Sequence, residues 1–251
     1  MDKLKLLMGR PILFNAEHKL FVRQPMVSEV VDMGEDVFNE LIMPFTLTSE
    51  AVFNGQDNVE ELASKYDIYD LFFERIEEDV FVLDNVFGGK SALGILKDSL
   101  SYFLQADEIQ FLMNRRKIAV DQFVMDKEEF MKLRLLIQGV SGKSDVTFEK
   151  IPKNMTERQK DIWAKLQAGR RRTAEREALY LQDMINFTSF GGSTYIPLNQ
   201  IDSMTYYQLS NAYKSVMSID AHKIGMGYKL SYKFDVKDEI KHWSEALKVG
   251  K

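Results

Sequence analysis

Apolar side chains recur with a helical period in the last third of the chain. The spacing i, i+3, i+4 and i+7 places four of them on one face of a helix: Leu181, Met184, Ile185 and Thr188. After a glycine-rich break at residues 191–193, Thr205 and Gln208 have the spacing of a capping box, which marks a second helix start. We therefore expect a helical hairpin over residues 174–224, with the rest of the chain built on it.

Short apolar runs elsewhere predict strands. Near the N-terminus they cover Leu4–Met8, Ile12–Phe14 and Leu20–Val22, with a polar turn before the last run. In the middle of the chain, apolar and polar residues alternate on both sides of the turn at residues 114–117, which predicts a β-hairpin over residues 109–120. A further alternating run, Tyr228–Phe234, also has the pattern of a strand.

Helical spacing covers much of the remainder. The stripe over Val27–Ile42, interrupted at Gly34, predicts a helix that ends before Pro44. Residues Leu71–Glu78 are expected to form a helix with one solvent-exposed face. Further helix starts are expected at capping residues: Ser91, Asp126 (with Glu129), Thr156 (with Gln159) and Asp235, the last opening a helix with Ile240, Trp243 and Leu247.

Together these elements predict a mainly α-helical α+β fold. Its strands are a small N-terminal pair and a mid-chain β-hairpin. We expect an N-terminal α+β region over residues 1–138, a linker over 139–155, where Gly, Ser, Lys and Pro replace the periodic pattern, and a helical C-terminal region over 156–251.

Composition narrows the class of protein. The chain has 251 residues, 45% of them hydrophobic and 28% charged, as in an ordinary globular protein. The net charge of −5 argues against binding of nucleic acid over the whole surface. The absence of cysteine fits a reducing cytoplasm, and no apolar run reaches the roughly 18 residues of a membrane span. We expect a soluble intracellular protein with no membrane partner.

Patterns typical of catalysis are weak or missing. Gly89-Lys90-Ser91 and Gly142-Lys143-Ser144 imitate a phosphate-binding loop, but Asp84 and Ile137 stand where that loop needs its first glycine. Asp220 and His222 could share a metal in principle, although a polar helix end or turn explains them more simply. We therefore expect no enzymatic activity, no cofactor and no metal.

The sharpest charge feature is basic. Residues 153–176 contain eight basic residues against three acidic ones, with three consecutive arginines. The candidate partner-binding residues are Trp163, Arg170, Arg171, Arg172 and Arg176. The tract could hold an acidic protein or nucleic acid, or it could be a solvated helix face that offsets the acidic stretch at residues 57–84. Nucleic acid is the less expected partner, since Trp163 is the single aromatic residue close by.

Several of these segments follow one another in an order that resembles a known family. They are the N-terminal strand pair, Met26–Phe38, Ile42–Phe45, the hairpin leading into Phe130–Gln138, Leu179–Ile185, Met204–Leu209 and Ile240–Trp243. This order resembles tail assembly chaperones or tail morphogenesis proteins of phages that infect Gram-positive bacteria. The likeness spans most of the chain and rests on caps and apolar stripes.

The resemblance implies a non-enzymatic protein in the host cytoplasm. Its partner would be the tape-measure protein or another tail protein, and self-association is also open. Two other classes remain as alternatives: a structural protein of the virion tail or baseplate, and a phage protein that binds a host complex through its acidic face.

Overall fold

The computed structural model describes residues 2–54, 58–77, 80–146, 155–192, 195–231, 233, 240 and 242–246. Its helices are α1 (Lys3–Leu7), α2 (Val27–Met33), α3 (Glu35–Thr46), α4 (Ser49–Val52), α5 (Val59–Lys65), α6 (Ile68–Leu71), α7 (Ala92–Leu104), α8 (Lys127–Ser141), α9 (Glu157–Glu177), α10 (Leu181–Asn186), α11 (Leu198–Asp202), α12 (Tyr206–Leu230) and α13 (Trp243–Ala246). Short helical turns are η1 (Val82–Asn85), η2 (Met113–Arg115) and the π-helical η3 (Phe187–Gly191). The strands are β1 (Ile12–Asn15), β2 (Leu20–Val22), β3 (Arg75–Glu77), β4 (Val80–Phe81), β5 (Ile109–Leu112), β6 (Lys117–Val120) and β7 (Phe123–Met125).

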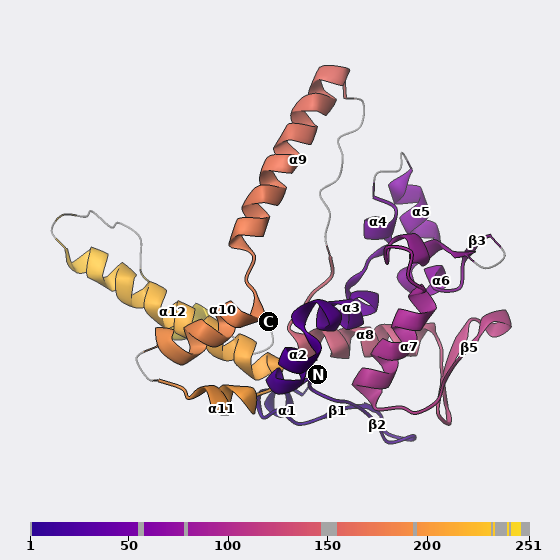
Figure 1. Cartoon of the computed structure of the whole chain (residues 1–251), viewed down its shortest axis with the longest axis horizontal. Coiled ribbons are helices and arrows are strands. Elements are labelled where there is room, and N and C mark those ends of the chain that lie inside the picture. Colours follow the sequence, from indigo (N-terminus) through magenta and orange to yellow (C-terminus); the bar gives the residue numbers. More distant parts are fainter. Residues whose placement is uncertain are drawn as a thin grey trace.

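The fold is a mainly helical α+β structure, as expected (Figure 1). Strands β1 and β2 form one antiparallel pair, and β5 and β6 form the predicted hairpin with Ile109 opposite Val120. The short strand β7 extends this hairpin to three strands, with Val120 opposite Phe123. Strand β7 is not predicted from the sequence, because the strand has only three residues and follows β6 after a tight turn in which Asp121 has a φ of 51°.

The hydrophobic core is centred on helices α3, α6, α7 and α8. Phe130 of α8 lies among aromatic rings from α3, from α6 and from the residue that follows α6, with ring centroids 5.8 Å from Phe45, 5.2 Å from Tyr69 and 6.1 Å from Phe72. Phe45 also packs edge-on against Phe103 of α7 at 6.0 Å. The expectation that the C-terminal hairpin organises the chain is therefore wrong: the largest fully buried side chains all lie between Leu6 and Phe130.

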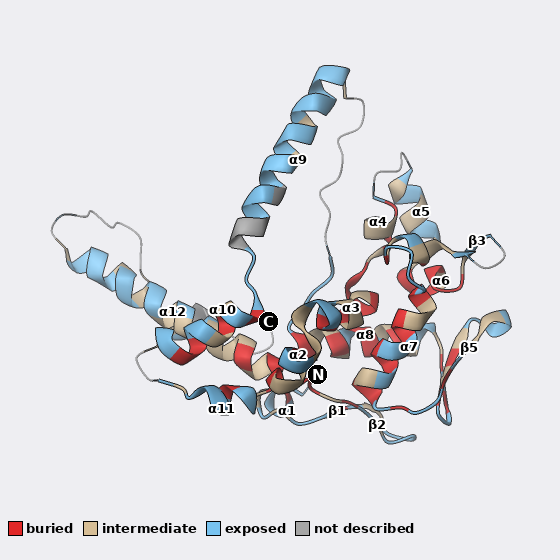
Figure 2. Ribbon diagram, viewed as in Figure 1, coloured by how far each residue is buried: buried red, intermediate tan, exposed pale blue. Residues whose placement is uncertain are grey.

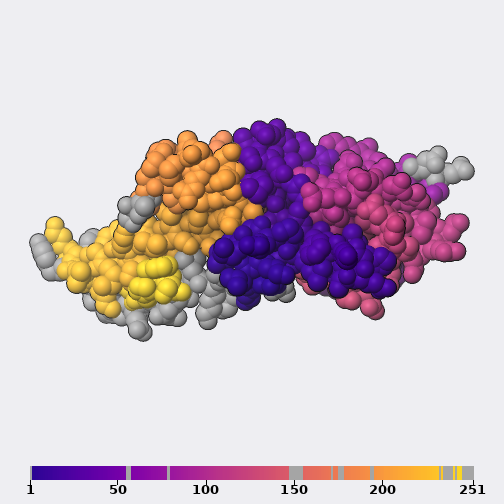
Figure 3. Space-filling view, turned by 90° about the horizontal axis from the view of Figure 1, so that it is seen from below, coloured from indigo at the N-terminus to yellow at the C-terminus, as the bar shows by residue number. Residues whose placement is uncertain are grey.

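The C-terminal helices form the expected packed pair and dock onto the N-terminal segment. α10 and η3 pack against α12. The backbone amide of Val27 donates to the Met204 carbonyl at 2.9 Å, and the amide of Tyr206 donates to the Pro25 carbonyl at 2.8 Å. Figure 3 shows the N-terminal residues in indigo between the mid-chain part and the C-terminal part. The N-terminal segment and the start of α12 thus share one core.

Two sequence expectations near the N-terminus need correction. Leu4–Met8 is helical rather than extended, because the Asp2 carboxylate accepts hydrogen bonds from the amides of Leu4 and Lys5, both at 3.1 Å, and starts α1. Helix α3 does not end before Pro44 but continues to Thr46. Burial of Phe45 and Thr46 in the core holds this last turn in place.

Two further segments have a secondary structure that differs from the expected one. After α6 the chain turns into β3 and β4 instead of continuing as the expected Leu71–Glu78 helix, and the Arg75 guanidinium lies over the Phe81 ring of the neighbouring strand at 5.2 Å. At the other end, α12 runs through Leu230, so the first part of the expected strand Tyr228–Phe234 is helical. Tyr232 and Phe234 lie outside the described residues, as do the expected cap Asp235 and Leu247.

The start of the expected linker is ordered by the core. Helix α8 runs to Ser141, three residues beyond its expected end, and Gly142 closes it with a φ of +63°. The Val146 amide then donates to the Thr46 carbonyl of α3 at 2.9 Å. Residues 147–154 lie outside the described part of the chain.

Candidate partner-binding surface

Helix α9 projects from the body of the protein. Figure 1 shows it standing away from the other helices, and Figure 2 shows it exposed along its length where its residues are described. Its 21 residues contain none that are buried among those whose side chains are described. Because none of the described side chains packs in the core, the stability of this helix depends on local signals within it.

The local signals for α9 are those that the sequence predicts. Gln159 donates its amide to the Thr156 hydroxyl at 3.4 Å, and its side-chain oxygen accepts from the Thr156 amide at 2.8 Å, so the capping box is confirmed. Lys160 pairs with Glu157 at 2.8 Å across one turn. After α9 the chain rejoins the body where the Leu181 amide donates to the Glu35 carboxylate at 2.9 Å.

The structure places all five candidate residues on α9. Trp163 is half-buried, and Arg170 and Arg172 are exposed. Arg171 and Arg176 lie in the same helix, but their side chains are outside the described part. Two aliphatic residues beside Trp163 are apolar residues of the expected helix but are not among the candidate binding residues. Ile162 and Leu166 are four positions apart, which sets them on one face, and their exposed fractions are 55% and 42%.

The charge of α9 is opposite to that of the rest of the chain. The helix contains seven basic and four acidic residues, a net charge of +3, so the remaining residues carry −8 of the total of −5. No acidic residue occurs in the sequence between Asp161 and Glu175, the stretch that contains Lys165 and the three arginines. This arrangement of basic side chains next to two exposed aliphatic ones suits an acidic amphipathic partner.

A second exposed apolar surface lies on the distal half of α12 and was missed by the sequence analysis. Met217, Ile224 and Tyr228 have exposed fractions of 42%, 54% and 51%. Their spacing in the sequence was the available signal, but the expected strand at Tyr228 broke the pattern. This half of α12 points away from the core (Figure 2).

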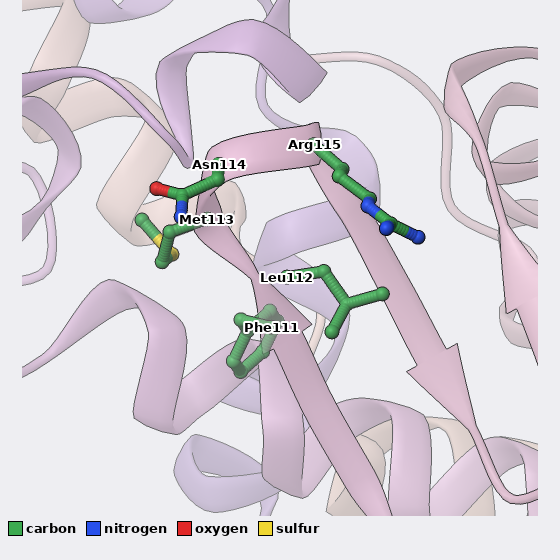
Figure 4. Close-up of a pocket in the computed structure, with 5 residues that line it drawn as sticks. All are labelled: Phe111, Leu112, Met113, Asn114 and Arg115. Carbon is green, nitrogen blue, oxygen red and sulfur yellow. The ribbon is translucent and has the colours of Figure 1, made fainter.

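Two hollows lie on the surface of the described residues. One, of about 330 Å³, is at the tip of the β5–β6 hairpin and is lined by five consecutive residues, Phe111 to Arg115, whose side chains spread in different directions (Figure 4). The other, of similar volume, has four polar residues in its lining: Asp36, Asn39, Glu40 and Lys90. Glu40 and Lys90 pair with each other at 2.7 Å.

The polar clusters inside the protein have structural roles. Glu29 accepts from the Met26 amide at the start of α2 and pairs with Arg23, while the Tyr102 hydroxyl donates to it at 3.3 Å. Burial raises the pKa of Glu29, but these hydrogen bonds and the Arg23 charge outweigh that effect and leave the pKa below its usual value. The carboxylate is thus held ionised as a helix cap.

The pKa values of Asp67 and Arg134 are also shifted by burial and by their polar contacts. Burial raises the pKa of Asp67, but its bonds to Lys127 and to the Asp70 amide outweigh that effect and lower the pKa overall. Arg134 is buried and donates to the carbonyls of Phe45 and Leu47 at 2.9 and 2.6 Å and to Asp145 at 2.6 Å. Burial lowers the pKa of its guanidinium, and the Asp145 charge opposes this change. Both clusters fasten α8 to its neighbours.

The weak sequence motifs have structural explanations too. Ser91 caps α7, and Gly142 ends α8, as expected for the two Gly-Lys-Ser segments. The His222 ring packs edge-on against the His242 ring, with centroids 5.2 Å apart. Across the described residues no group of three histidine, aspartate or glutamate side chains is placed to hold a metal ion.

Within the described residues, no helix is both long enough and apolar enough to cross a bilayer.

Searches against protein-family models, curated proteins and solved structures each found no match for this chain.

Proposed function

We propose that the protein is a non-enzymatic phage tail assembly chaperone, or a related morphogenesis factor, that acts in the host cytoplasm. Its partner is the tape-measure protein or another tail protein, and α9 makes the polar part of the contact. The order of sequence segments supports the class of protein. The observation that carries the binding role is α9 itself: a basic helix with exposed aliphatic side chains that stands apart from the core.

The packing of the core does not depend on the described side chains of α9, because none of them is buried. A projecting surface of mixed charge and apolar character instead suits a long helical partner, whose apolar stripe would otherwise aggregate before assembly. Bidentate contacts from the arginines to carboxylates would fix the register of such a partner.

Co-expression with the tape-measure protein of the same genome tests the proposal. We expect the tape measure to become soluble and to elute in a complex with this protein. If solubility is unchanged and no complex elutes, the proposal fails. Mass spectrometry of purified virions separates the chaperone from the structural alternative, since an assembly factor is missing from finished particles and a tail or baseplate component is present.

A charge-matched pair of variants tests the role of α9. Changing Arg170, Arg171 and Arg172 together to alanine should weaken the complex without shifting the melting temperature, because Arg170 and Arg172 are exposed and none of the described side chains of α9 is buried. The control replaces three exposed basic residues of the body, Lys97, Arg115 and Lys132, with alanine and alters the net charge equally. Equal binding by both triple variants would show that the arginines are solvated surface.

Salt dependence distinguishes the kind of partner. Binding to duplex DNA loses about 0.9 log units of affinity per log unit of salt for each phosphate neutralised. A protein contact centred on apolar helices should weaken much less. We expect the shallow dependence for the parent complex.

A further inference from the structure

The segment that carries α9 leaves and rejoins the body of the protein at the two ends of helix α3. Before α9, the Val146 amide donates to the carbonyl of Thr46, the last residue of α3, at 2.9 Å. After α9, the Leu181 amide donates to the carboxylate of Glu35, the first residue of α3, at 2.9 Å. If α9 lay down between these two contacts, it would therefore run antiparallel to α3.

The outward face of α3 has carboxylates at one end and apolar side chains at the other. Four residues spaced i, i+3, i+4 and i+7 lie on this side of the helix: Asp36, Asn39, Glu40 and Met43. Asp36 and Asn39 are exposed, and Glu40 already pairs with Lys90. The four residues of α3 line the second hollow, of about 330 Å³, together with Val86, Phe87 and Lys90. A further basic side chain would therefore meet Asp36, and an apolar one would meet Met43.

One side of α9 carries complementary side chains in the reverse order. Six of its residues are spaced by four, three, four, three and four positions and so share one face: Arg158, Ile162, Lys165, Gly169, Arg172 and Arg176. Leu166 borders this face beside Ile162, and both are exposed. A Cβ atom added at Gly169 would meet nothing within 4 Å, so a second helix can approach closely there. The aliphatic residues thus precede Arg172 and Arg176 along α9.

In the antiparallel direction the complementary groups meet in pairs. Arg172 and Leu166 are about 9 Å apart along α9, and Asp36 and Met43 are about 10.5 Å apart along α3, at 1.5 Å per residue. Arg172 can therefore lie against Asp36 while Leu166 reaches the hollow at Met43. A parallel helix would set Leu166 against the carboxylates, and it would oppose the chain direction between the two end contacts.

Residues 178–180 provide the turning point. They lie between α9 and α10, all three are exposed, and the backbone at Tyr180 is extended, with φ −94° and ψ 160°. The four Cα–Cα steps from Glu177 to Leu181 span up to about 14 Å. With Arg172 at Asp36, Glu177 would lie about 6 Å past the start of α3 and about 8–10 Å to its side. The connection is therefore long enough to leave both helices intact.

From the two contacts at the ends of α3 and the matching side chains, we propose that α9 closes antiparallel onto the outward face of α3 in the same chain. This is a second conformation, beside the one in which α9 stands away from the body (Figure 1). Because α9 is tethered to this face, its effective concentration there is on the order of millimolar, so a weak contact is enough to populate the closed form. The inference concerns the chain alone and does not depend on the proposed tail partner.

Disulfide trapping tests the contact. The chain has no cysteine, so a pair of introduced cysteines reports one contact. Under mild oxidation, Met43→Cys with Leu166→Cys should form an intramolecular disulfide, detected by non-reducing electrophoresis and by mass. The control pair, Met43→Cys with Ala164→Cys, moves the second cysteine to the far side of α9, where Ala164 is exposed. We expect the first pair to cross-link at least several-fold faster than the control.

Charge reversal on α3 tests the polar half of the contact. In the Met43→Cys, Leu166→Cys protein, Asp36→Lys sets a positive charge against Arg172 and should slow cross-linking at least several-fold. The control, Asp98→Lys, changes the net charge equally at an exposed position of α7 and should leave the rate as it was. Asp36 lies in the first turn of α3, where a carboxylate favours the helix, so circular dichroism must verify the fold. If that variant is unfolded, the exposed Asn39→Lys makes the same test one turn further along.

Three results would overturn the closure. Equal rates for the two cysteine pairs would show that α9 does not present Leu166 to α3. Disulfides that form mainly between chains, at a rate that falls on dilution, would place α9 on a second copy instead. Equal rates in the α3 lysine variant and in Asp98→Lys would show that the charges of α3 do not attract α9.

Discussion

At the scale of single residues, Thr205 joins a helix cap to a contact between distant parts of the chain. Its hydroxyl accepts from the Gln208 amide at 3.2 Å, and the Gln208 side-chain oxygen accepts from the Thr205 amide at 2.8 Å. The Gln208 side chain also donates to the Leu7 carbonyl at 3.0 Å, and the Thr205 hydroxyl bonds Gln24 at 3.3 Å. The start of α12 is thereby fastened to the N-terminal segment.

We expect Thr205→Ala to lower the free energy of unfolding by about 1–2 kcal/mol, because the variant loses both the cap and the bond to Gln24. Urea titration followed by circular dichroism measures this change. Thr156→Ala removes a cap of the same type from α9, which does not pack in the core, so its cost to global unfolding should stay below about 0.5 kcal/mol. Equal costs for the two variants would contradict this difference between the helices.

Tyr206 should make the stability depend on alkaline pH. Burial, with a smaller contribution from the Glu35 charge, raises the pKa of its phenol to about 12, whereas an unfolded tyrosine has a pKa of about 10. The folded state thus favours the protonated phenol. Its contribution to stability is complete below pH 10 and is lost as the pH rises towards 12.

The measurement is the free energy of unfolding at several values between about pH 9 and pH 12. Tyr206→Phe should reduce the loss of stability over this range. The loss should not vanish, since burial also raises the pKa values of Tyr69 and Tyr102. Tyr180→Phe, at an exposed position, is the control, and an identical pH dependence for the two variants would refute the assignment.

At the scale of elements, Arg134 connects helix α8 to the end of α3. The carbonyls of Phe45 and Leu47 lie past the last hydrogen-bonded turns of α3, and the buried guanidinium supplies donors to both. Asp145, which follows α8, accepts from the same guanidinium and is half exposed. One side chain thus donates to three acceptors, two at the end of α3 and one in the segment that follows α8.

Arg134→Met should lower the free energy of unfolding by about 1–3 kcal/mol, since methionine fills part of the volume but removes the donor to the Leu47 carbonyl, while Gln138 still donates to the Phe45 carbonyl at 2.7 Å. Asp145→Asn should cost about 1 kcal/mol or less, because the carboxylate is half exposed and water can replace part of its contact. Both values come from urea unfolding. A larger cost for Asp145→Asn would show that the ion pair, not the carbonyl contacts, stabilises this junction.

The elements that sequence predicts correctly are those set by local chemistry. The capping boxes at Asp126, Thr156 and Thr205 are all formed, because each needs side chains only three residues apart. The β5–β6 hairpin was predictable for the same reason. Of the candidate site, the sequence located the residues on one helix, but nothing in their spacing indicated that the helix projects from the body.

The elements that sequence predicts wrongly are set by distant contacts. After Leu71 the chain forms strand β3 and not the expected helix, because Arg75 pairs with Phe81 of the neighbouring strand β4. Pro44 remains within α3 because core packing of Phe45 outweighs the missing amide. The position of the core itself depends on how α3, α7 and α8 meet, which periodicity within one helix does not specify.

At the scale of the whole molecule, the segments before and after α9 belong to one structure. The α12 start pairs with Met26 and Pro25, and Ile201, Tyr206 and Leu209 are buried in the same core as the N-terminal helices. The predicted regions 1–138 and 156–251 therefore share an interface in the described part of the chain.

Limited trypsin digestion should cut the chain first at the arginines of α9, because cleavage needs an exposed and locally unfolded segment. We expect the two fragments to remain together on size exclusion under native conditions and to separate in denaturant. Mass spectrometry identifies the cut. Fragments that separate without denaturant would show that the two regions fold as independent domains.

The projecting position of α9 also has a consequence for how this protein can change over generations. A core side chain is constrained by every neighbour, so a substitution there usually reduces stability. On α9, substitutions at exposed positions leave the packed interior as it was, so the proposed partner, and not the core, limits which sequences are tolerated there. If the sequence of that proposed partner changes, α9 can change with it by single substitutions while the core stays constant.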